Sequence, residues 1–303
     1  MAYQVLDNGD ASEREQIALE TEWVITGNAP LLTPEQIEAV GAGKLACPKC
    51  NGRRYYLIPV KGKTTGFVTS LKHDCNCREI QRFFTRWNAM IPVAYRKFNR
   101  LEALQPSRDS KCQLTKQAEV LDALQAHPDR SCLFVGPPGY SKTVFSTALF
   151  SHALKQWARE YKRGGSPDSC WFISAYDLVQ QAQDYVTARE IKSTDADGNS
   201  DTREALEPLV SVRKIREAVA AGLKPRLFIE ELDKLPHVTE FRGSTIFELV
   251  KEIDAQGGQL VVTSNLSAAD LAKMYQIRDG EALVRRFTDG NATGDGRTFD
   301  LFN

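Results

Sequence analysis

Short apolar runs end in polar residues at three places in the second half of the chain. They cover residues 131–135, 225–229 and 259–263, and each leads into small, acidic or amide residues. A short apolar run bounded in this way is typical of a buried strand. A helical pattern follows the first run, from Val144 to about Tyr161. The pattern predicts an α/β fold with polar residues gathered at the carboxyl edge of the sheet.

The first hundred residues predict shorter elements. Thr33–Gln36 has the pattern of a capping box with Pro at the first helical position, and Gly41 ends the helix that it opens. Residues 54–60 and 66–71 are predicted to be two strands joined by a Lys/Gly turn. A further helix is predicted from Glu79 to about Met90.

Charge divides the chain into three blocks. The whole chain has 39 Lys and Arg and 39 Asp and Glu, so its formal net charge is zero. Residues 1–43 hold one Arg and eight acids, residues 44–100 hold thirteen bases and two acids, and residues 101–303 hold 25 bases and 29 acids. An acidic arm before a basic segment indicates separate surfaces for a protein partner and for phosphate.

No targeting or membrane segment is visible. No apolar run approaches the roughly 18 residues of a spanning helix, and the N-terminus lacks a basic-then-apolar signal pattern. We therefore expect a cytoplasmic protein.

Four cysteines in the basic segment have the spacing of metal ligands. Cys47 and Cys50 precede the predicted strand pair, and Cys75 and Cys77 follow it. Such thiolates can share one tetrahedral Zn²⁺, which would stabilise a segment too short to form much core. His73 is an alternative ligand, and a disulfide framework or no metal at all are the alternatives to a zinc site. The other cysteines stand singly among apolar neighbours and are expected to be core thiols: Cys112, Cys132 and Cys170.

The predicted helix 79–90 carries arginines at four-residue spacing. Arg78, Arg82 and Arg86 would form one basic face, suited to lie along phosphates. An ordinary solvated face is the equally weighted alternative.

The most specific motif follows the first apolar run. It is a phosphate-binding loop in a strand–loop–helix context, and it departs from G-x-x-x-x-G-K-[ST] only where Ser141 replaces the last Gly. Backbone N–H groups would hold the β-phosphate, Lys142 would neutralise the β- and γ-phosphate oxygens, and Thr143 would bind Mg²⁺. The expected nucleotide-binding residues are Gly136, Pro137, Pro138, Gly139, Tyr140, Ser141, Lys142, Thr143 and Val144.

Two acids follow the second run. Glu230 is predicted to hold the water shell of Mg²⁺, and Glu231 to orient and deprotonate the attacking water. The first of these positions is usually Asp, so Glu230 is a second departure from the usual pattern. These two departures, Glu230 and Ser141, leave open that ATP hydrolysis is slow.

Two weaker signals complete the candidate site. Asn265 ends the third predicted strand, residues 259–265, and its side chain has the reach to orient water near a γ-phosphate. Arg285 and Arg286 end a predicted helix, and an arginine given to a neighbouring subunit would couple hydrolysis to assembly. Each signal alone has an ordinary surface role as its alternative.

Together these motifs resemble the AAA+ ATPases, specifically the DnaC-type helicase loaders and the helper ATPases of insertion-sequence transposition. The resemblance covers roughly residues 45–303, through these segments: IPVAYRKF (91–98), the phosphate-binding loop (136–143), CWFISAYDLV (170–179), the acidic strand end (227–231), GQLVVTSNL (258–266) and LVRRF (283–287). It implies Asn265 as sensor 1 and Arg286 as the arginine finger. It also implies a parallel five-stranded sheet between helices, with 297–302 as the last strand, and no separate lid.

Charge and the resemblance together divide the chain into four parts. From their charge, residues 1–43, which the resemblance does not cover, would be an acidic partner-binding arm. Residues 44–80 would be a zinc-ribbon-like module, 81–100 a basic linker helix and entry segment, and 101–303 the ATPase core. The polar tract 192–203 would be a mobile loop in the region that faces DNA in the family.

The sequence therefore predicts an ATP- and Mg²⁺-dependent protein that assembles with its own copies into a ring or helical filament and acts on DNA. Its partner would be a replicative helicase if it is a loader, or a transposase if it is a transposition helper. A nucleotide-binding adaptor with little or no hydrolysis is the alternative from another class.

Overall fold

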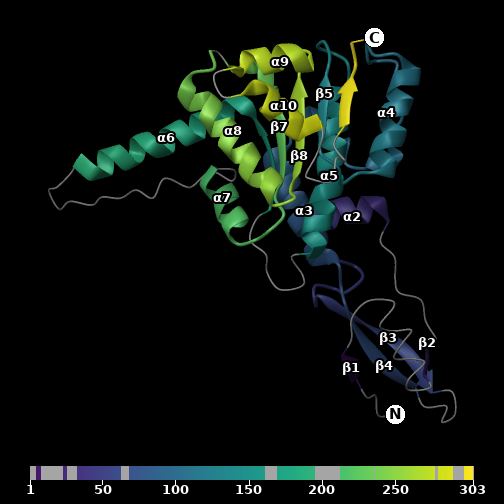
Figure 1. Ribbon diagram of the computed structural model, residues 1–303. Helices are drawn as coiled ribbons and strands as arrows, with labels where there is room; N and C mark the ends of the chain where they lie inside the picture. Colours follow the sequence, from purple (N-terminus) through teal and green to yellow (C-terminus); the bar gives the residue numbers. More distant parts are fainter. Residues whose placement is uncertain are drawn as a thin grey trace. The chain divides into compact units, whose positions relative to one another are not determined.

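The structure of the protein is a computed structural model (Figure 1). It describes residues 5–7, 23–25, 33–62, 68–160, 169–194, 212–235, 237–276, 279–288 and 297–302. Most of the polar tract 192–203 lies outside the described residues. The chain divides into two compact units, Met1–Arg86 and Trp87–Asn303.

A five-stranded parallel sheet forms the centre of the second unit. Its strands are β5 (Cys132–Val135), β6 (Cys170–Ser174), β7 (Arg226–Glu230), β8 (Gln259–Ser264) and β9 (Arg297–Asp300). Their order in the sheet is β6-β7-β8-β5-β9, and every neighbouring pair is parallel. All five carboxyl ends therefore lie at one edge, and the α/β fold class predicted from the sequence is confirmed.

Strands β5 to β8 are buried on both faces, which explains their continuous apolar runs, whereas the edge strand β9 alternates half-buried and exposed residues. On one face Leu133, Trp171 and Leu260 join a core cluster with residues of the helices that follow β6 and β7. On the other face, aromatic side chains of the strands pack against the helix that follows β5. The ring centroid of Phe150 in that helix is 5.2 Å from the centroids of both Phe172 and Phe228.

Helices cover the sheet on both sides (Figure 1). They are α4 (Leu114–Ala126), α5 (Lys142–Glu160), α6 (Ala175–Thr194), α7 (Val212–Ala220), α8 (Glu240–Ala255), α9 (Ala268–Met274) and α10 (Gly280–Thr288). Single 3₁₀ turns are η1 (Val93–Tyr95), η2 (Leu101–Ala103) and η4 (Leu232–Lys234). In the part of the chain described here, no helix is long and apolar enough to span a bilayer.

The first unit contains the predicted strand pair, but the second strand begins and ends later in the chain than predicted. Strands β3 (Tyr55–Gly62) and β4 (Val68–Asp74) are antiparallel, and residues 63–67 of the predicted turn and second strand lie outside the described ranges. The predicted helix α2 (Pro34–Gly41) begins with a complete capping box between Thr33 and Gln36. Helix α3 (Cys77–Met90) starts at the last of the four cysteines.

Two features of this unit differ from the sequence analysis. The acidic arm supplies two strands that were not predicted, β1 (Val5–Asp7) parallel to β4 and β2 (Trp23–Ile25) antiparallel to β3. The prediction of one exposed basic face on α3 is wrong at Arg86, which is buried at 6% exposure, whereas Arg78 is exposed. Four-residue spacing places side chains on one helix face but does not say whether that face is covered.

Candidate nucleotide site and metal centre

The phosphate-binding loop lines a cavity at the carboxyl edge of the parallel sheet. The cavity has a volume of about 530 Å³, within the range of small-molecule sites. Residues from four separate segments line it, among them Tyr95, Phe98, Pro138, Gly139, Tyr140, Ser141, Lys142, Thr143, Val144, Glu231, Asp233 and Asn265. Gly136 and Pro137 belong to the loop and accept hydrogen bonds from Lys142 through their carbonyl groups. Glu230 is buried at the end of β7.

The backbone of the loop requires glycine at two positions and strains a third. Gly139 has φ +88° and Gly136 has φ +153°, and a Cβ on Gly136 would lie 2.8 Å from Cβ of Leu301. Ser141, in the position usually held by Gly, also has a positive φ, of 63°. For a residue with a side chain this left-handed conformation costs about 1–2 kcal/mol. The departure seen in the sequence therefore carries a conformational cost.

Lys142 is held inside the loop by three acceptors. Its Nζ donates to the carbonyl oxygens of Gly136 and Pro137 and, at 3.0 Å, to Oδ1 of Asn265. Burial lowers the pKa of Lys142, while the carboxylates of Asp233 and its acidic neighbours oppose that shift. The ammonium thus lies among oxygen atoms, which is the environment that phosphate oxygens would also provide.

Glu230 is buried, at 7% exposure, at the end of β7. Burial raises the pKa of its carboxyl group, and hydroxyls of Ser146, Thr143 and Thr263 oppose the shift. Among the described residues, no hydrogen-bond partner is found for its Oε1. A buried carboxylate oxygen without a partner, near a threonine hydroxyl, fits the oxygen ligands that Mg²⁺ prefers.

Glu231 and Asn265 are brought to the same cavity from β7 and β8. Glu231 is exposed, has a left-handed backbone (φ 55°) and donates its N–H to Oγ1 of Thr263 at 2.9 Å. Asn265 is held by Asp233, which accepts hydrogen bonds from its backbone and its side chain. Asp233 was missed in the sequence analysis, because nothing in its local pattern shows contact with a residue 32 positions away.

Another wall of the cavity comes from the segment before α4. The rings of Tyr95 and Phe98 line it, and their centroids are 6.4 Å apart. Gln117, buried on α4, ties this wall together by exchanging two hydrogen bonds of 3.0 Å with the backbone of Ser107 and donating to the carbonyl of Cys112. The sequence analysis did not identify Gln117.

Arg286 does not line this cavity. It lies on α10, where its Nη1 donates to the carbonyl of Ala282 at 2.8 Å and its Nε is 3.8 Å from a carboxylate oxygen of Asp254. Arg285 beside it is exposed. The structure therefore separates the predicted finger from the other predicted site residues of the same chain.

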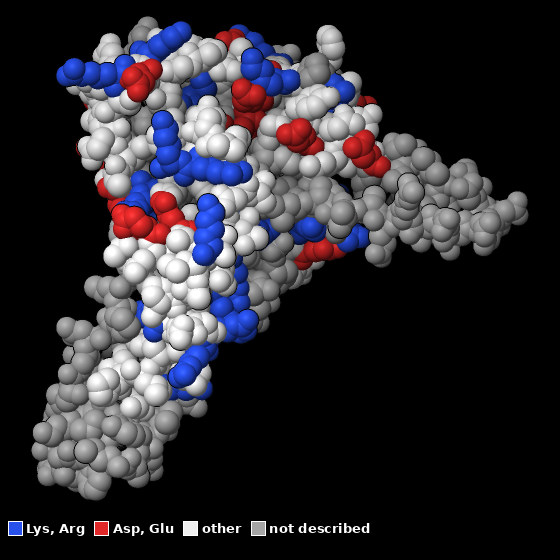
Figure 2. Space-filling model, turned by 180° about the vertical axis from the view of Figure 1, so that it is seen from behind, with Lys and Arg blue, Asp and Glu red and all other residues white. Residues whose placement is uncertain are grey.

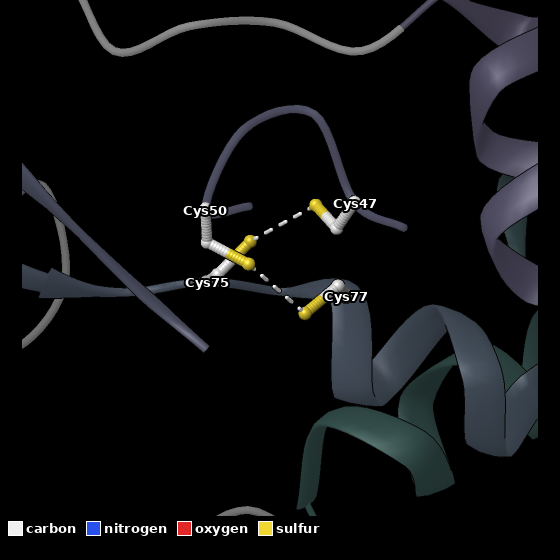
Figure 3. Close-up of side chains that lie close together, drawn as sticks. All are labelled: Cys47, Cys50, Cys75 and Cys77. Atoms are coloured by element: carbon white, nitrogen blue, oxygen red, sulfur yellow. Dashed lines mark hydrogen bonds between the residues drawn. The ribbon is translucent and has the colours of Figure 1, made fainter. Parts of the chain in front are cut away.

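The four predicted metal-ligating cysteines converge in the first unit (Figure 3). Their sulfur atoms all lie within 4.8 Å of one another, and all four side chains are buried. Sγ of Cys47 is 3.6 Å from that of Cys75, and Sγ of Cys50 is 3.7 Å from that of Cys77. Zn–S bonds of about 2.3 Å in a tetrahedron place sulfurs about 3.8 Å apart, whereas a disulfide needs about 2.05 Å. The arrangement fits a four-sulfur metal site.

His73, the alternative ligand, is not part of this cluster. Its ring packs edge-on against Tyr56, with centroids 4.9 Å apart. Burial raises the pKa of Cys77 to about 11 and also raises that of Cys75. A metal ion would therefore have to displace protons from these thiols. The other three cysteines are buried free thiols, as predicted: Cys112, Cys132 and Cys170.

Fold and site together define an α/β protein with a P-loop at the carboxyl edge of a parallel sheet. No protein-family model matches the chain, and no curated protein sequence matches it significantly. Among solved structures, the crystal structure of the DnaC helicase loader aligns with a TM-score of 0.41 and 14% identity, over 69% of this chain and 99% of that one. AMPPCP-bound DnaA from Aquifex aeolicus aligns with a TM-score of 0.39 and 15% identity, over 69% of this chain and 50% of that one.

Proposed function

We propose that the protein is an AAA+ ATPase that hydrolyses ATP with Mg²⁺ and assembles with its own copies on DNA to load a replicative helicase. One observation carries the ATPase part of this proposal. The loop with Lys142, the acid Glu231 and the amide Asn265 line the same cavity, although they come from three different strand ends. A phosphate-binding group, a base and a polar positioning group are the parts that phosphoryl transfer to water requires.

In this proposal each residue has a separate task. Loop N–H groups and Lys142 bind the phosphates, and Thr143 with Glu230 holds Mg²⁺. When bound, the ion neutralises charge on the β- and γ-phosphate oxygens. Glu231 accepts a proton from the attacking water, and its exposed position in the cavity lets water reach it. Arg286 would act on the nucleotide of a neighbouring subunit.

The first unit supports the assignment of a phosphate-bearing partner and of Zn²⁺. Exposed bases include Lys44, Arg53, Arg54 and Arg78. On the one face that Figure 2 shows, Lys and Arg recur over the described part of this unit. Zn²⁺ in the four-cysteine cluster would join the start of β3 to the end of β4, and Arg53, Arg54 and Arg78 lie in the segments next to the cysteines. Such a surface is suited to the phosphates of DNA, and the acidic arm would bind the helicase.

An ATPase assay of the full chain tests the enzyme. We expect Mg²⁺-dependent release of phosphate, measured without DNA and with single-stranded and duplex DNA. Glu231→Gln should abolish turnover while nucleotide still binds, because the isosteric amide cannot accept the proton. If wild-type turnover stays at background in every condition and Glu231→Gln changes nothing, the protein is a nucleotide-binding adaptor and the proposal is wrong.

A separate experiment tests the partner. The protein is mixed with a hexameric replicative helicase, with and without ATP, and the mixture is analysed by sizing. A stable complex that is lost on deleting residues 1–43 supports helicase loading through the acidic arm. Stimulation of a transposase without any helicase complex would identify a transposition helper instead.

A further inference from the structure

Asp233 fixes Asn265 by two hydrogen bonds. It lies in η4, directly after β7, and its Oδ1 accepts from the backbone N–H of Asn265 at 2.8 Å. Its Oδ2 accepts from the side-chain Nδ2 of the same residue at 3.0 Å. Both oxygens of one carboxylate are therefore committed to a single residue of the cavity wall.

These contacts decide which end of the Asn265 amide faces the phosphate-binding loop. A carboxylate accepts hydrogen bonds and donates none, so only the NH₂ end of the amide can face Asp233. The carbonyl end then points toward the loop, where Oδ1 accepts from Nζ of Lys142. Asn265 consequently presents an acceptor to the loop, and one of the two protons on its Nδ2 is donated to Asp233.

Oδ1 of Asn265 is one of three acceptors to which Nζ of Lys142 donates. An ammonium group has three protons, and Lys142 donates to Gly136, Pro137 and Asn265. Phosphate oxygens bound in the loop would replace such acceptors, because hydrogen bonds between charged groups are the stronger ones. Oδ1 of Asn265 would then be available to another donor in the cavity.

We propose that Asp233 is a positioning residue, which holds Asn265 so that Oδ1 accepts a hydrogen bond from the attacking water and Nδ2 does not donate to the γ-phosphate. The inference rests on the proposed ATPase function and refines one residue's role within it. The water oxygen forms the bond to the γ-phosphorus while the bond to the bridging oxygen breaks, and ADP leaves with that electron pair. One water proton passes to Glu231, and the other, held by Asn265, stays on the phosphate product.

A donor–acceptor swap tests the direction of this hydrogen bond. Asp233→Asn alone and Asn265→Asp alone should each lower kcat by about tenfold or more, with a smaller change in KM, since the step affected follows binding. The double variant Asp233→Asn/Asn265→Asp restores one donor and one acceptor between the two positions. It also leaves a carboxylate oxygen facing Lys142, so kcat should recover about tenfold over the less active single variant.

The swap distinguishes a residue 265 that accepts a hydrogen bond from water from one that donates to the γ-phosphate, because a carboxylate at this position can accept but cannot donate. If Asn265 acts by donating, the double variant stays as inactive as the worse single variant, and the proposal is overturned. Asp270→Asn is the matched control. Like Asn265, Asp270 follows β8, but its carboxylate binds Ser267 and Lys273 at the surface. Its replacement should therefore leave kcat within about twofold of wild type.

A second measurement does not depend on turnover. The side-chain amide NMR signal of Asn265, identified by its loss in Asn265→Ala, should shift in Asp233→Asn and stay in place in Asp270→Asn. Absence of a shift in Asp233→Asn overturns the positioning role. If the signal shifts but the wild-type protein hydrolyses no ATP, the contact stands and the proposed ATPase function fails.

Discussion

Arg286 lies over the ring of Phe247, with 5.1 Å between the guanidinium carbon and the ring centroid. Its Nε also lies 3.8 Å from Asp254, and its side chain is only 24% exposed. The predicted arginine finger is thus held by α8 of its own chain. Burial raises the pKa of Asp254 and the charge of Arg286 opposes this, so the arginine favours the ionised partner. To act on a neighbouring subunit, Arg286 would have to leave these contacts.

Variants of the two adjacent arginines separate an internal role from a role in assembly. Arg286→Ala should lower the free energy of unfolding by about 0.5–1 kcal/mol, because a cation–π contact is lost, whereas Arg285→Ala at an exposed position should change it little. Thermal melts of the two variants measure this difference.

The role of Arg286 in assembly is tested by mixing two kinds of variant subunit. Arg286→Ala subunits should be inactive alone, because an arginine finger contributes about 10³-fold or more to turnover. Adding Lys142→Ala subunits, which keep Arg286 but cannot bind phosphate, should restore part of the activity. If mixing restores nothing while the melting temperature still falls, Arg286 serves only the stability of its own chain.

The four-cysteine cluster should hold one Zn²⁺ per chain. Cys50→Ser and Cys77→Ser should each lose the metal, measured by elemental analysis, because a neutral hydroxyl is a poor replacement for a thiolate ligand. Cys112→Ser is the matched control, since Cys112 is also buried but lies outside the cluster. His73→Ala should keep the zinc; loss of zinc from that variant would instead make His73 a ligand.

Loss of the metal should also have a local structural effect. The cluster joins the segment before β3 to the end of β4, and among the described residues of this unit the four cysteines make up half of the buried core cluster, beside Val40, Tyr56, Ile58 and Leu71. Circular dichroism should therefore show loss of strand signal in the zinc-free variants. Nucleotide binding by the second unit, measured with a fluorescent analogue, should remain. Simultaneous loss of both would contradict a separate role for the metal.

We expect Glu230 to contribute to Mg²⁺ binding but not to the stability of the metal-free protein. Glu230→Gln keeps the shape of the side chain but removes a buried carboxylate whose Oε1 is unpartnered among the described residues. Without Mg²⁺ we expect the variant to be at least as stable as wild type, with a gain of up to about 1 kcal/mol in the free energy of unfolding. The increase in melting temperature on adding Mg²⁺ and ATP should be much smaller than in wild type.

The exposed neighbour supplies the control for this prediction. Glu231→Gln should change the metal-free melting temperature little and keep the increase with Mg²⁺ and ATP. A Glu230→Gln variant that melts clearly below wild type without metal, yet keeps the full increase on adding ligand, would contradict the role assigned to Glu230.

The features predicted correctly from the sequence share a physical cause. Strands such as β7 and β8 are buried on both faces, so their apolar runs mark them directly, and the polar residues at their ends fall at one edge of the sheet. The cysteine pairs converge because they flank an antiparallel strand pair. In these cases local pattern and chain topology are enough to place the residues.

The features that were missed depend on contacts between distant segments. Strands β1 and β2 are only three residues long, and their pairing is set by the edges of β3 and β4. Asp233 acts on a residue of another strand end, and burial of Arg86 depends on what covers one helix face. None of these contacts leaves a periodic signal in the sequence.

Ser141 offers a test of whether its departure from glycine affects nucleotide binding or only conformational energy. Its φ of 63° costs about 1–2 kcal/mol for a side-chain residue, and Gly would avoid this but lose about 0.5–1 kcal/mol to chain entropy. Ser141→Gly should therefore raise the free energy of unfolding by up to about 1 kcal/mol and leave nucleotide affinity unchanged, because both residues keep the backbone N–H. Ser141→Ala retains the Cβ and should bring no gain in stability. Weaker nucleotide binding by both variants, measured by titration, would instead show that the serine hydroxyl itself contacts the nucleotide.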